Sequence, residues 1–230
     1  MPKGTLKKAI DISKESVMEY LRKIQNDDLI QRIAEKVKDF YDSHKKDYTP
    51  IDSYQNSYGA LLEYGKKCDK KDQYIILAHA IYGWMPTVLE IDFNVENSIE
   101  NAIDTLKNID FVQVDDVIDK VRTVAKFTNN SFVGASKFLH FICPDKFAIL
   151  DSTILNVLKE DRFNLKIDKR NHFFSKTSAN SMKNFIGYQL IMQKTLKMLK
   201  DENPEIKLRD IEKVLFYSVP KKQRKKTKDR

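Results

Sequence analysis

The sequence predicts an all-α protein, folded as a compact multi-helix globular domain. Every apolar segment longer than about ten residues repeats its apolar side chains at three- and four-residue spacing, and none alternates as a strand would. Six glycines and six prolines are few for 230 residues, which favours long helices with short connections. The 41% hydrophobic content is typical of a folded chain that buries one sizeable core or two small ones.

The first helices are each delimited by capping or breaking residues. Ser13 can cap the first helix, and the segment 28–43 keeps helical spacing until a polar run that Pro50 terminates. Asp52 or Ser53 can then cap a third helix. After these, the sequence predicts three helices over 95–106, 114–125 and 206–219, a long helix over 178–201, and an irregular, mobile connection over 160–178.

The most apolar stretch of the chain is 71–91, KDQYIILAHAIYGWMPTVLEI, which has helical length up to Tyr82. It is therefore expected to form a central buried helix, broken near Gly83 and Pro86. His79 lies in this apolar setting without a second metal-ligating group one helical turn away. A neutral, hydrogen-bonded core histidine is the favoured interpretation, and a metal ligand is the alternative.

The chemically richest stretch is 131–153, SFVGASKFLHFICPDKFAILDST, which predicts a helix, a loop and the start of another helix. Its apolar side chains share one helix face, and its polar side chains Ser136, Lys137 and His140 share the opposite face. The sequence therefore predicts an amphipathic helix with a mixed polar outer stripe. Pro144 ends this helix and starts a short buried connector toward Leu150.

Asp151, Ser152 and Thr153 form an N-cap cluster that opens the next helix. Amide groups and the helix dipole favour negative charge at this position, so a carboxylate there could stabilise a cation. Because the same residues also serve purely as helix caps, two interpretations of Asp151 stay open at this point.

The positive charge of the chain is concentrated at its ends. The formal charge is +8, of which residues 221–230 carry +6 and Lys3, Lys7 and Lys8 carry +3, so 9–220 is close to neutral. The tail can attract phosphates independently of sequence, or act as a solubilising end. We therefore expect a flexible N-terminus over 1–12, a helical domain over 13–219 with either one core or two lobes and a cleft near 131–153, and a flexible basic tail over 220–230.

Several classes of protein are disfavoured. Cys68 and Cys143 are far apart in the sequence, so we expect reduced thiols rather than a disulfide framework or an iron–sulfur site. The chain has no signal peptide and no apolar run of the roughly 18–20 residues that span a bilayer, which predicts a cytoplasmic protein without membrane contact. No phosphate loop, GxSxG or zinc motif occurs, so neither a cofactor nor a metal is predicted.

With these residues in view, the stretch 130–158 resembles the core of the helix-hairpin-helix DNA glycosylase superfamily, the endonuclease III-like base-excision enzymes. The hairpin glycine corresponds to Gly134, the following helix to GASKFLHFI, the connector to PDKFAIL and the aspartate motif to LDSTILNVL. The chain departs from the family in having one hairpin glycine, and in placing Lys137 one position later than the family's lysine. The resemblance implies a related fold and a base-excision activity on DNA.

The resemblance also implies roles for individual residues. Asp151 would stabilise positive charge at the sugar or activate the attacking nucleophile, Lys137 would be a nucleophile, and His140 would be a reserve acid or base. The residues expected to contact nucleic acid are Lys126, Asn130, Ser131, Gly134 and Ser136, with Lys221, Lys222, Arg224, Lys225 and Lys226 of the tail. The alternative is a non-catalytic all-α module that binds nucleic acid or a protein, in which Asp151 is only a cap.

Overall fold

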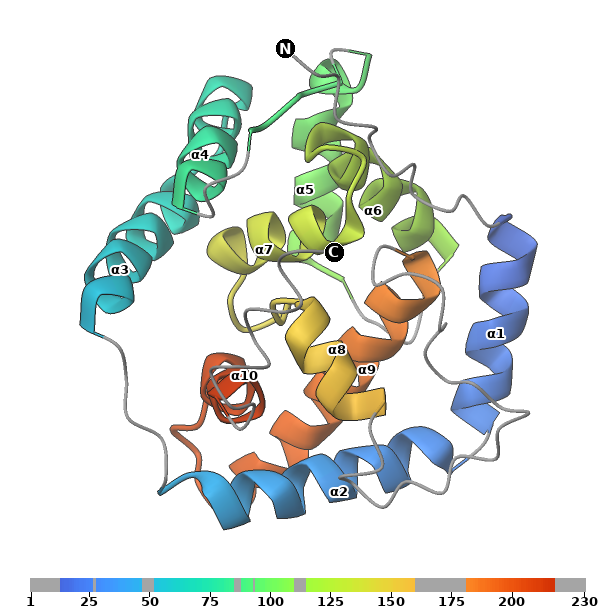
Figure 1. Ribbon diagram of the computed structural model, residues 1–230. Coiled ribbons are helices and arrows are strands. Elements are labelled where there is room, and N and C mark those ends of the chain that lie inside the picture. Colours follow the sequence, from blue (N-terminus) through green and yellow to red (C-terminus); the bar gives the residue numbers. More distant parts are fainter. Residues whose placement is uncertain are drawn as a thin grey trace.

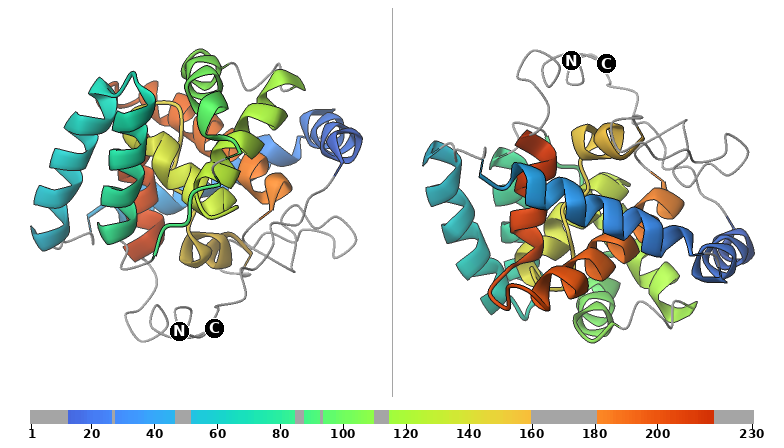
Figure 2. Two further views of the ribbon diagram at one scale, coloured as in Figure 1. Left: turned by 90° about the horizontal axis from the view of Figure 1, so that it is seen from above. Right: turned by 90° about the horizontal axis from the view of Figure 1, so that it is seen from below.

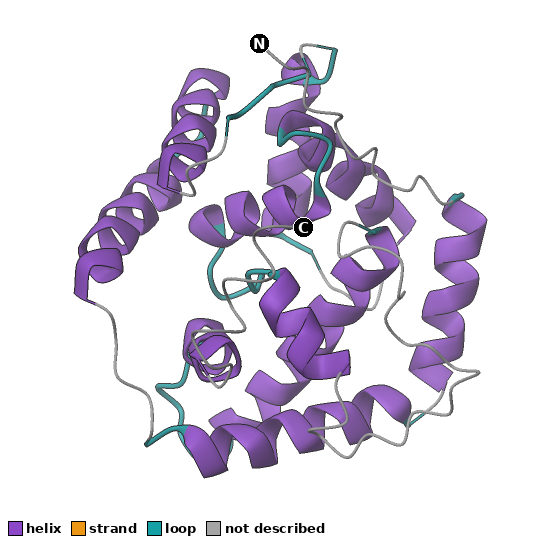
Figure 3. Cartoon of the chain, viewed as in Figure 1, coloured by secondary structure: helices purple, strands orange, loops and turns teal. Residues whose placement is uncertain are grey.

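The structure, a computed structural model, describes residues 13–26, 28–46, 52–84, 88–92, 94–109, 115–159 and 181–217. Within these ranges the regular structure is helical and no strand occurs (Figure 3). The helices are α1 Lys14–Asn26, α2 Leu29–His44, α3 Asp52–Lys67, α4 Lys71–Trp84, a 3-10 turn Glu96–Ser98, α5 Ile99–Lys107, α6 Asp115–Phe127, α7 Phe132–Ile142, α8 Ser152–Lys159, α9 Met182–Lys200 and α10 Leu208–Tyr217. The all-α prediction is confirmed. The predicted mobile connection, the N-terminus 1–12 and the basic tail lie outside the described residues.

Serine side chains begin three of these helices. The hydroxyl oxygen of Ser13 accepts a hydrogen bond from the amide of Ser16 at 3.2 Å, as the sequence predicts. Ser131 does the same for the amide of Gly134 at 3.0 Å, and Ser181 for Asn184 at 3.2 Å. Each bond satisfies an amide that the helix itself leaves without a partner.

Helix α7 lies in the middle of the molecule, and most of the other helices pack in two groups around it and α9 (Figures 1 and 2). In one group α3, α4 and α6 pack against α7, and α5 packs against α6. In the other group α1, α2 and α10 pack against α9, and α8 packs against α10. Contacts between α7 and α9 join the groups, and buried side chains from both form one hydrophobic cluster.

The prediction of a central buried helix over 71–91 is wrong. Helix α4 lies at the edge of the molecule beside α3 (Figure 1), and it is buried only along the face that carries Tyr74, Leu77 and Ile81. Ile76 is 56% exposed, and His79 is exposed rather than a core histidine. The physical reason is that few helices pack against α4. Part of its apolar surface therefore stays exposed to solvent.

The turn between α6 and α7 requires special backbone geometry. Asn129 and Asn130 have positive φ angles of 59° and 49°, a region that asparagine tolerates better than most residues. The Asn129 amide group also donates a hydrogen bond to the Val88 carbonyl at 2.7 Å, which ties the turn to the segment after α4. The turn therefore reverses the chain so that α6 and α7 pack against each other.

Candidate functional site

Helix α7 is buried on nearly all sides. Its side chains at Val133 and Lys137 are partly exposed, while the remaining positions, including Ser136 and His140, are buried. The predicted polar outer stripe is therefore wrong for Ser136 and His140. The face on which they lie is not solvated, because α3, α9, α10 and the connector cover it.

His140 is completely buried and uses both ring nitrogens. Its Nδ1 lies 2.7 Å from the Phe147 carbonyl oxygen, which can only accept, so Nδ1 carries the hydrogen. The Tyr58 hydroxyl then donates to Nε2, at 2.7 Å. Burial lowers the pKa of His140, which favours the neutral imidazole that this bonding requires. The predicted role of a surface acid or base does not fit this position.

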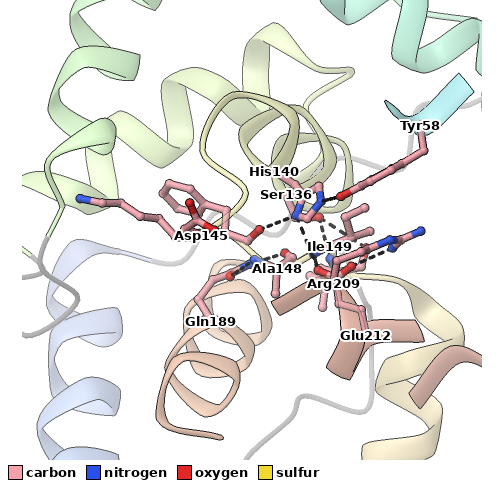
Figure 4. Close-up of polar contacts among 12 residues, drawn as sticks. Tyr58, Ser136, His140, Asp145, Ala148, Ile149, Gln189, Arg209 and Glu212 are labelled. Atoms are coloured by element: carbon pink, nitrogen blue, oxygen red, sulfur yellow. Dashed lines mark hydrogen bonds and ion pairs between the residues drawn. The ribbon is translucent and has the colours of Figure 1, made fainter. Parts of the chain in front are cut away.

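The buried connector, residues Phe147–Leu150, receives its hydrogen bonds from side chains of three helices (Figure 4). The Gln189 amide group of α9 both donates to the Ala148 carbonyl at 2.8 Å and accepts from the Ala148 amide at 2.7 Å. The amide of Ile149 donates to Glu212 of α10, and the amide of Leu150 donates to Ser136 of α7 at 2.9 Å. An extended buried segment cannot satisfy its own backbone, so these side chains supply the partners.

We call Ser136, His140, Gln189 and Glu212 the clamp, because together they hold the connector. Glu212 is fully buried and pairs with Arg209, whose Nη1 lies 2.7 Å from Oε2. Burial lowers the pKa of Arg209, and the Glu212 carboxylate more than offsets this effect. The Glu212 Oε1 atom lies 3.7 Å from His140 Nδ1, so the carboxylate is close to the neutral histidine without a hydrogen bond to it.

Sequence reasoning did not find Tyr58, Gln189, Arg209 or Glu212. Tyr58, Gln189 and Glu212 lie between 41 and 82 residues from the positions they bind, on helices that no local pattern connects to α7. Arg209 joins them through its pairing with Glu212, three residues away. The available signal is weak: Glu212 interrupts the apolar face of α10 formed by Ile211 and Leu215. A charged residue next to a core position is more often solvated than buried, so this signal does not identify a site.

Asp151 and Lys137 are each partly exposed, whereas the side chains of the clamp are buried. The Asp151 Oδ1 atom accepts a hydrogen bond from the amide of Thr153 at 2.7 Å, so the predicted N-cap of α8 is confirmed. Ser136 and Leu150 are joined by a hydrogen bond, and Lys137 and Asp151 are the residues that directly follow them. The backbones that carry the two predicted catalytic residues are therefore held beside each other.

The predicted phosphate-binding residues divide into exposed and buried ones. Lys126 and Asn130 are exposed at the α6–α7 turn, and Ser131 is partly exposed while it caps α7. Gly134 is buried: a Cβ atom there would collide with the Tyr82 hydroxyl and lie 2.9 Å from the Thr128 carbonyl. Ser136 is buried in the clamp. The tail residues Lys221, Lys222, Arg224, Lys225 and Lys226 lie outside the described part of the chain.

Other features of the described residues lie apart from this region. A surface hollow between the end of α2 and the α9–α10 turn, which includes Tyr41 and Leu199, contains none of the predicted site residues. The described part of the chain contains no group of three histidine, cysteine or acidic side chains arranged to hold a metal ion. Cys68 and Cys143 are free thiols, as predicted. None of the helices described here is both long and apolar enough to cross a bilayer.

Comparison of the chain with family models, with curated proteins and with solved structures gives no match.

Proposed function

We propose that the protein binds DNA and removes a damaged or modified base from it, as a base-excision glycosylase in which Asp151 stabilises the positive charge that develops on the sugar. One observation carries this proposal. The Ser136–Leu150 hydrogen bond holds the start of α8 against α7, and Lys137 and Asp151 follow the bonded residues on partly exposed positions. A cation-stabilising carboxylate and a basic side chain are thereby presented from two anchored helices.

The position of Asp151 suits this chemistry. Its Oδ1 atom accepts the Thr153 amide, and the N-terminus of α8 favours negative charge there. A base leaves the sugar through a transition state with cationic character at the anomeric carbon, which a nearby fixed carboxylate stabilises. A flipped nucleotide would have to reach this carboxylate, because a stacked base in a duplex is inaccessible.

Two nucleophiles are compatible with the proposal. Lys137 could attack the anomeric carbon and form a Schiff base, or a water molecule could attack it directly. His140 is not part of the proposed chemistry, since both of its nitrogens hold neighbouring groups. Borohydride treatment of a mixture of the protein with damaged DNA would trap the Schiff base, and Lys137→Ala would abolish that adduct.

The test of Asp151 separates chemistry from capping. Asp151→Asn keeps an oxygen that can accept the Thr153 amide but removes the charge, so base release should fall at least about a hundredfold while the melting temperature changes little. The substrates are duplexes with deaminated, oxidised or alkylated bases, with an undamaged duplex as control. If no duplex loses a base and no adduct is trapped, glycosylase activity is refuted.

The alternative function is a non-catalytic module that binds nucleic acid, and the positions of Lys126 and Asn130 favour it. Both are exposed at the α6–α7 turn, where they can contact phosphates without any chemistry. In either case the folded body is close to neutral, so removing 221–230 should reduce the salt dependence of DNA binding. An unchanged salt dependence would place the phosphate contacts on the folded body instead.

A further inference from the structure

Large apolar side chains that stay exposed are concentrated in one region of the described part of the chain. Tyr64, Ile76 and Val88 are 37%, 56% and 80% exposed, and all three lie on α3, on α4 or just after α4. Ile76 belongs to α4, which runs along the edge of the molecule (Figure 1). Exposed apolar surface gathered in one region is typical of a contact with another macromolecule.

The exposed side of α4 forms one stripe that carries little charge. The chain has 32% charged residues, but no Asp, Glu, Lys or Arg occurs from 73 to 84. A helix face that only meets water normally carries several charged side chains, so this face is better suited to contact than to solvation. The stripe follows helical spacing and consists of Asp72, Ile76, His79, Ala80 and Gly83.

The polar groups of the stripe lie on either side of Ile76. Asp72 is four residues before Ile76 and His79 is three residues after it, which places them about 6 Å and about 4.5 Å from Ile76 along the helix axis. Neither the Asp72 nor the His79 side chain has a hydrogen bond or an ion pair with another described residue. A carboxylate acceptor and an imidazole donor therefore flank an apolar residue at nearly equal distances.

This arrangement is complementary to itself. If two copies of α4 pack antiparallel about a two-fold axis at Ile76, Asp72 of each copy lies opposite His79 of the other. Parallel packing would instead place the two Asp72 carboxylates against each other, which is unfavourable. A second helix can also approach closely, because a Cβ atom added at Gly83 would meet nothing within 4 Å.

We propose that the exposed stripe of α4 is the interface of a symmetric homodimer, in which two α4 helices pack antiparallel with Ile76 at the two-fold axis and an Asp72–His79 pair on each side. A helix of 14 residues is about 21 Å long, so this contact buries less than the roughly 1,200–2,000 Å² of a stable complex. The dimer is therefore transient, with a dissociation constant on the order of 100 µM. The stripe faces away from the core, so this inference does not depend on the proposed base-excision activity.

Sedimentation velocity of the full chain at about 5–500 µM tests the interface. We expect the wild type to change from monomer to dimer over this range. Ile76→Asp should weaken dimerisation at least about tenfold, because it places two carboxylates against each other at the axis. The matched control, Val88→Asp, makes a similar change at an exposed apolar residue outside α4 and should leave dimerisation unchanged. Melting temperatures of both variants should stay close to that of the wild type, since both side chains are exposed.

An exchange of charges tests the antiparallel arrangement. Asp72→Lys should weaken dimerisation at least about threefold, because both symmetric pairs are lost together. Adding His79→Glu to Asp72→Lys creates two opposite-charge pairs in the reverse sense and should restore dimerisation. A wild type that stays monomeric over the whole range, or a dimer that Ile76→Asp leaves intact, overturns the inference. A double variant that dimerises as weakly as Asp72→Lys overturns the antiparallel pairing. None of these results changes the expected release of bases, so the proposed function is tested separately.

Discussion

Ser136 and His140 of the clamp come from the same short stretch of sequence as Lys137 and Asp151, yet the two pairs differ in how far their polar atoms remain available to a ligand. In the clamp, Ser136 and His140 are completely buried and their polar atoms hold the connector. Lys137, one residue after Ser136, and Asp151, one residue after the buried Leu150, are partly exposed. For Lys137 the reason is that a step of one residue along α7 rotates the side chain by about 100°, which is enough to move it from the core to the surface.

Polar residues gathered in one stretch of sequence therefore do not share one role. A buried carboxylate such as Glu212 must be paired to be tolerated, and its pairing with Arg209 and Ile149 makes it a structural group. A carboxylate at a helix start, such as Asp151, is stabilised by amides and remains able to act on a ligand.

Removing the buried carboxylate should cost the most stability. We expect Glu212→Ala to lower the free energy of unfolding by about 3 kcal/mol, because Arg209 and the Ile149 amide lose their partner. The matched control is Glu202→Ala, which breaks a surface pair with Lys38 and should cost less than about 1 kcal/mol. Denaturant unfolding measures both. Equal losses would show that the clamp is no more important than a surface ion pair.

Gly134, near the start of α7, tests whether this end of the helix belongs to the buried or the exposed region. Gly134→Ala should lower the free energy of unfolding by about 1–3 kcal/mol, because the added Cβ atom meets Tyr82 and the Thr128 carbonyl. Gly59→Ala, inside α3 with open space around it, should instead stabilise the protein by about 0.5–1 kcal/mol. A Gly134→Ala variant with normal stability but weaker DNA binding would assign this glycine to phosphate contact rather than packing.

The buried histidine should make stability depend on pH. Because burial lowers the pKa of His140 in the folded state, the unfolded chain binds more protons once the pH falls below the ordinary histidine pKa of about 6.5. The contribution of the neutral His140 side chain to the free energy of unfolding is complete above about pH 6.5. It is lost as the pH decreases toward the pKa of His140 in the folded state, by up to about 1.4 kcal/mol per pH unit.

Chemical denaturation of His140→Gln over pH 5–8 measures this contribution. The variant should lose that part of the pH dependence, whereas His79→Gln, which changes an exposed histidine, should keep it. If the free energy of unfolding of His140→Gln depends on pH as that of the wild type does, the imidazole is not held neutral in the folded protein.

The smallest change in stability is expected for substitution of Asp151, which is partly exposed. Asp151→Asn should change the free energy of unfolding by less than about 0.5 kcal/mol, since asparagine caps helices as well as aspartate does. Asp151→Ala should cost about 0.5–2 kcal/mol through loss of the bond to the Thr153 amide. Thermal melts of both variants provide the measurement, and a large loss in Asp151→Asn would place this carboxylate with the buried clamp.

Much of the secondary structure could be predicted because it depends on neighbours along the chain. Apolar spacing located the helices, Ser13 and Asp151 were recognised as caps, and Pro144 marked the end of α7. The exposure of α4 and the burial of His140 could not be predicted in this way. An apolar or polar face indicates which side of a helix prefers the core, but not how many other helices cover it.

The helical class and the starts of α1 and α8, with Asp151 at the beginning of α8, follow from the sequence alone, because capping and periodicity are local properties of consecutive residues. The tertiary structure alone decided that Tyr58, Gln189 and Glu212 meet His140 and the connector. Those contacts join residues that are distant in the chain, and they exist because the backbone of a buried, non-helical segment requires partners that its own residues cannot supply.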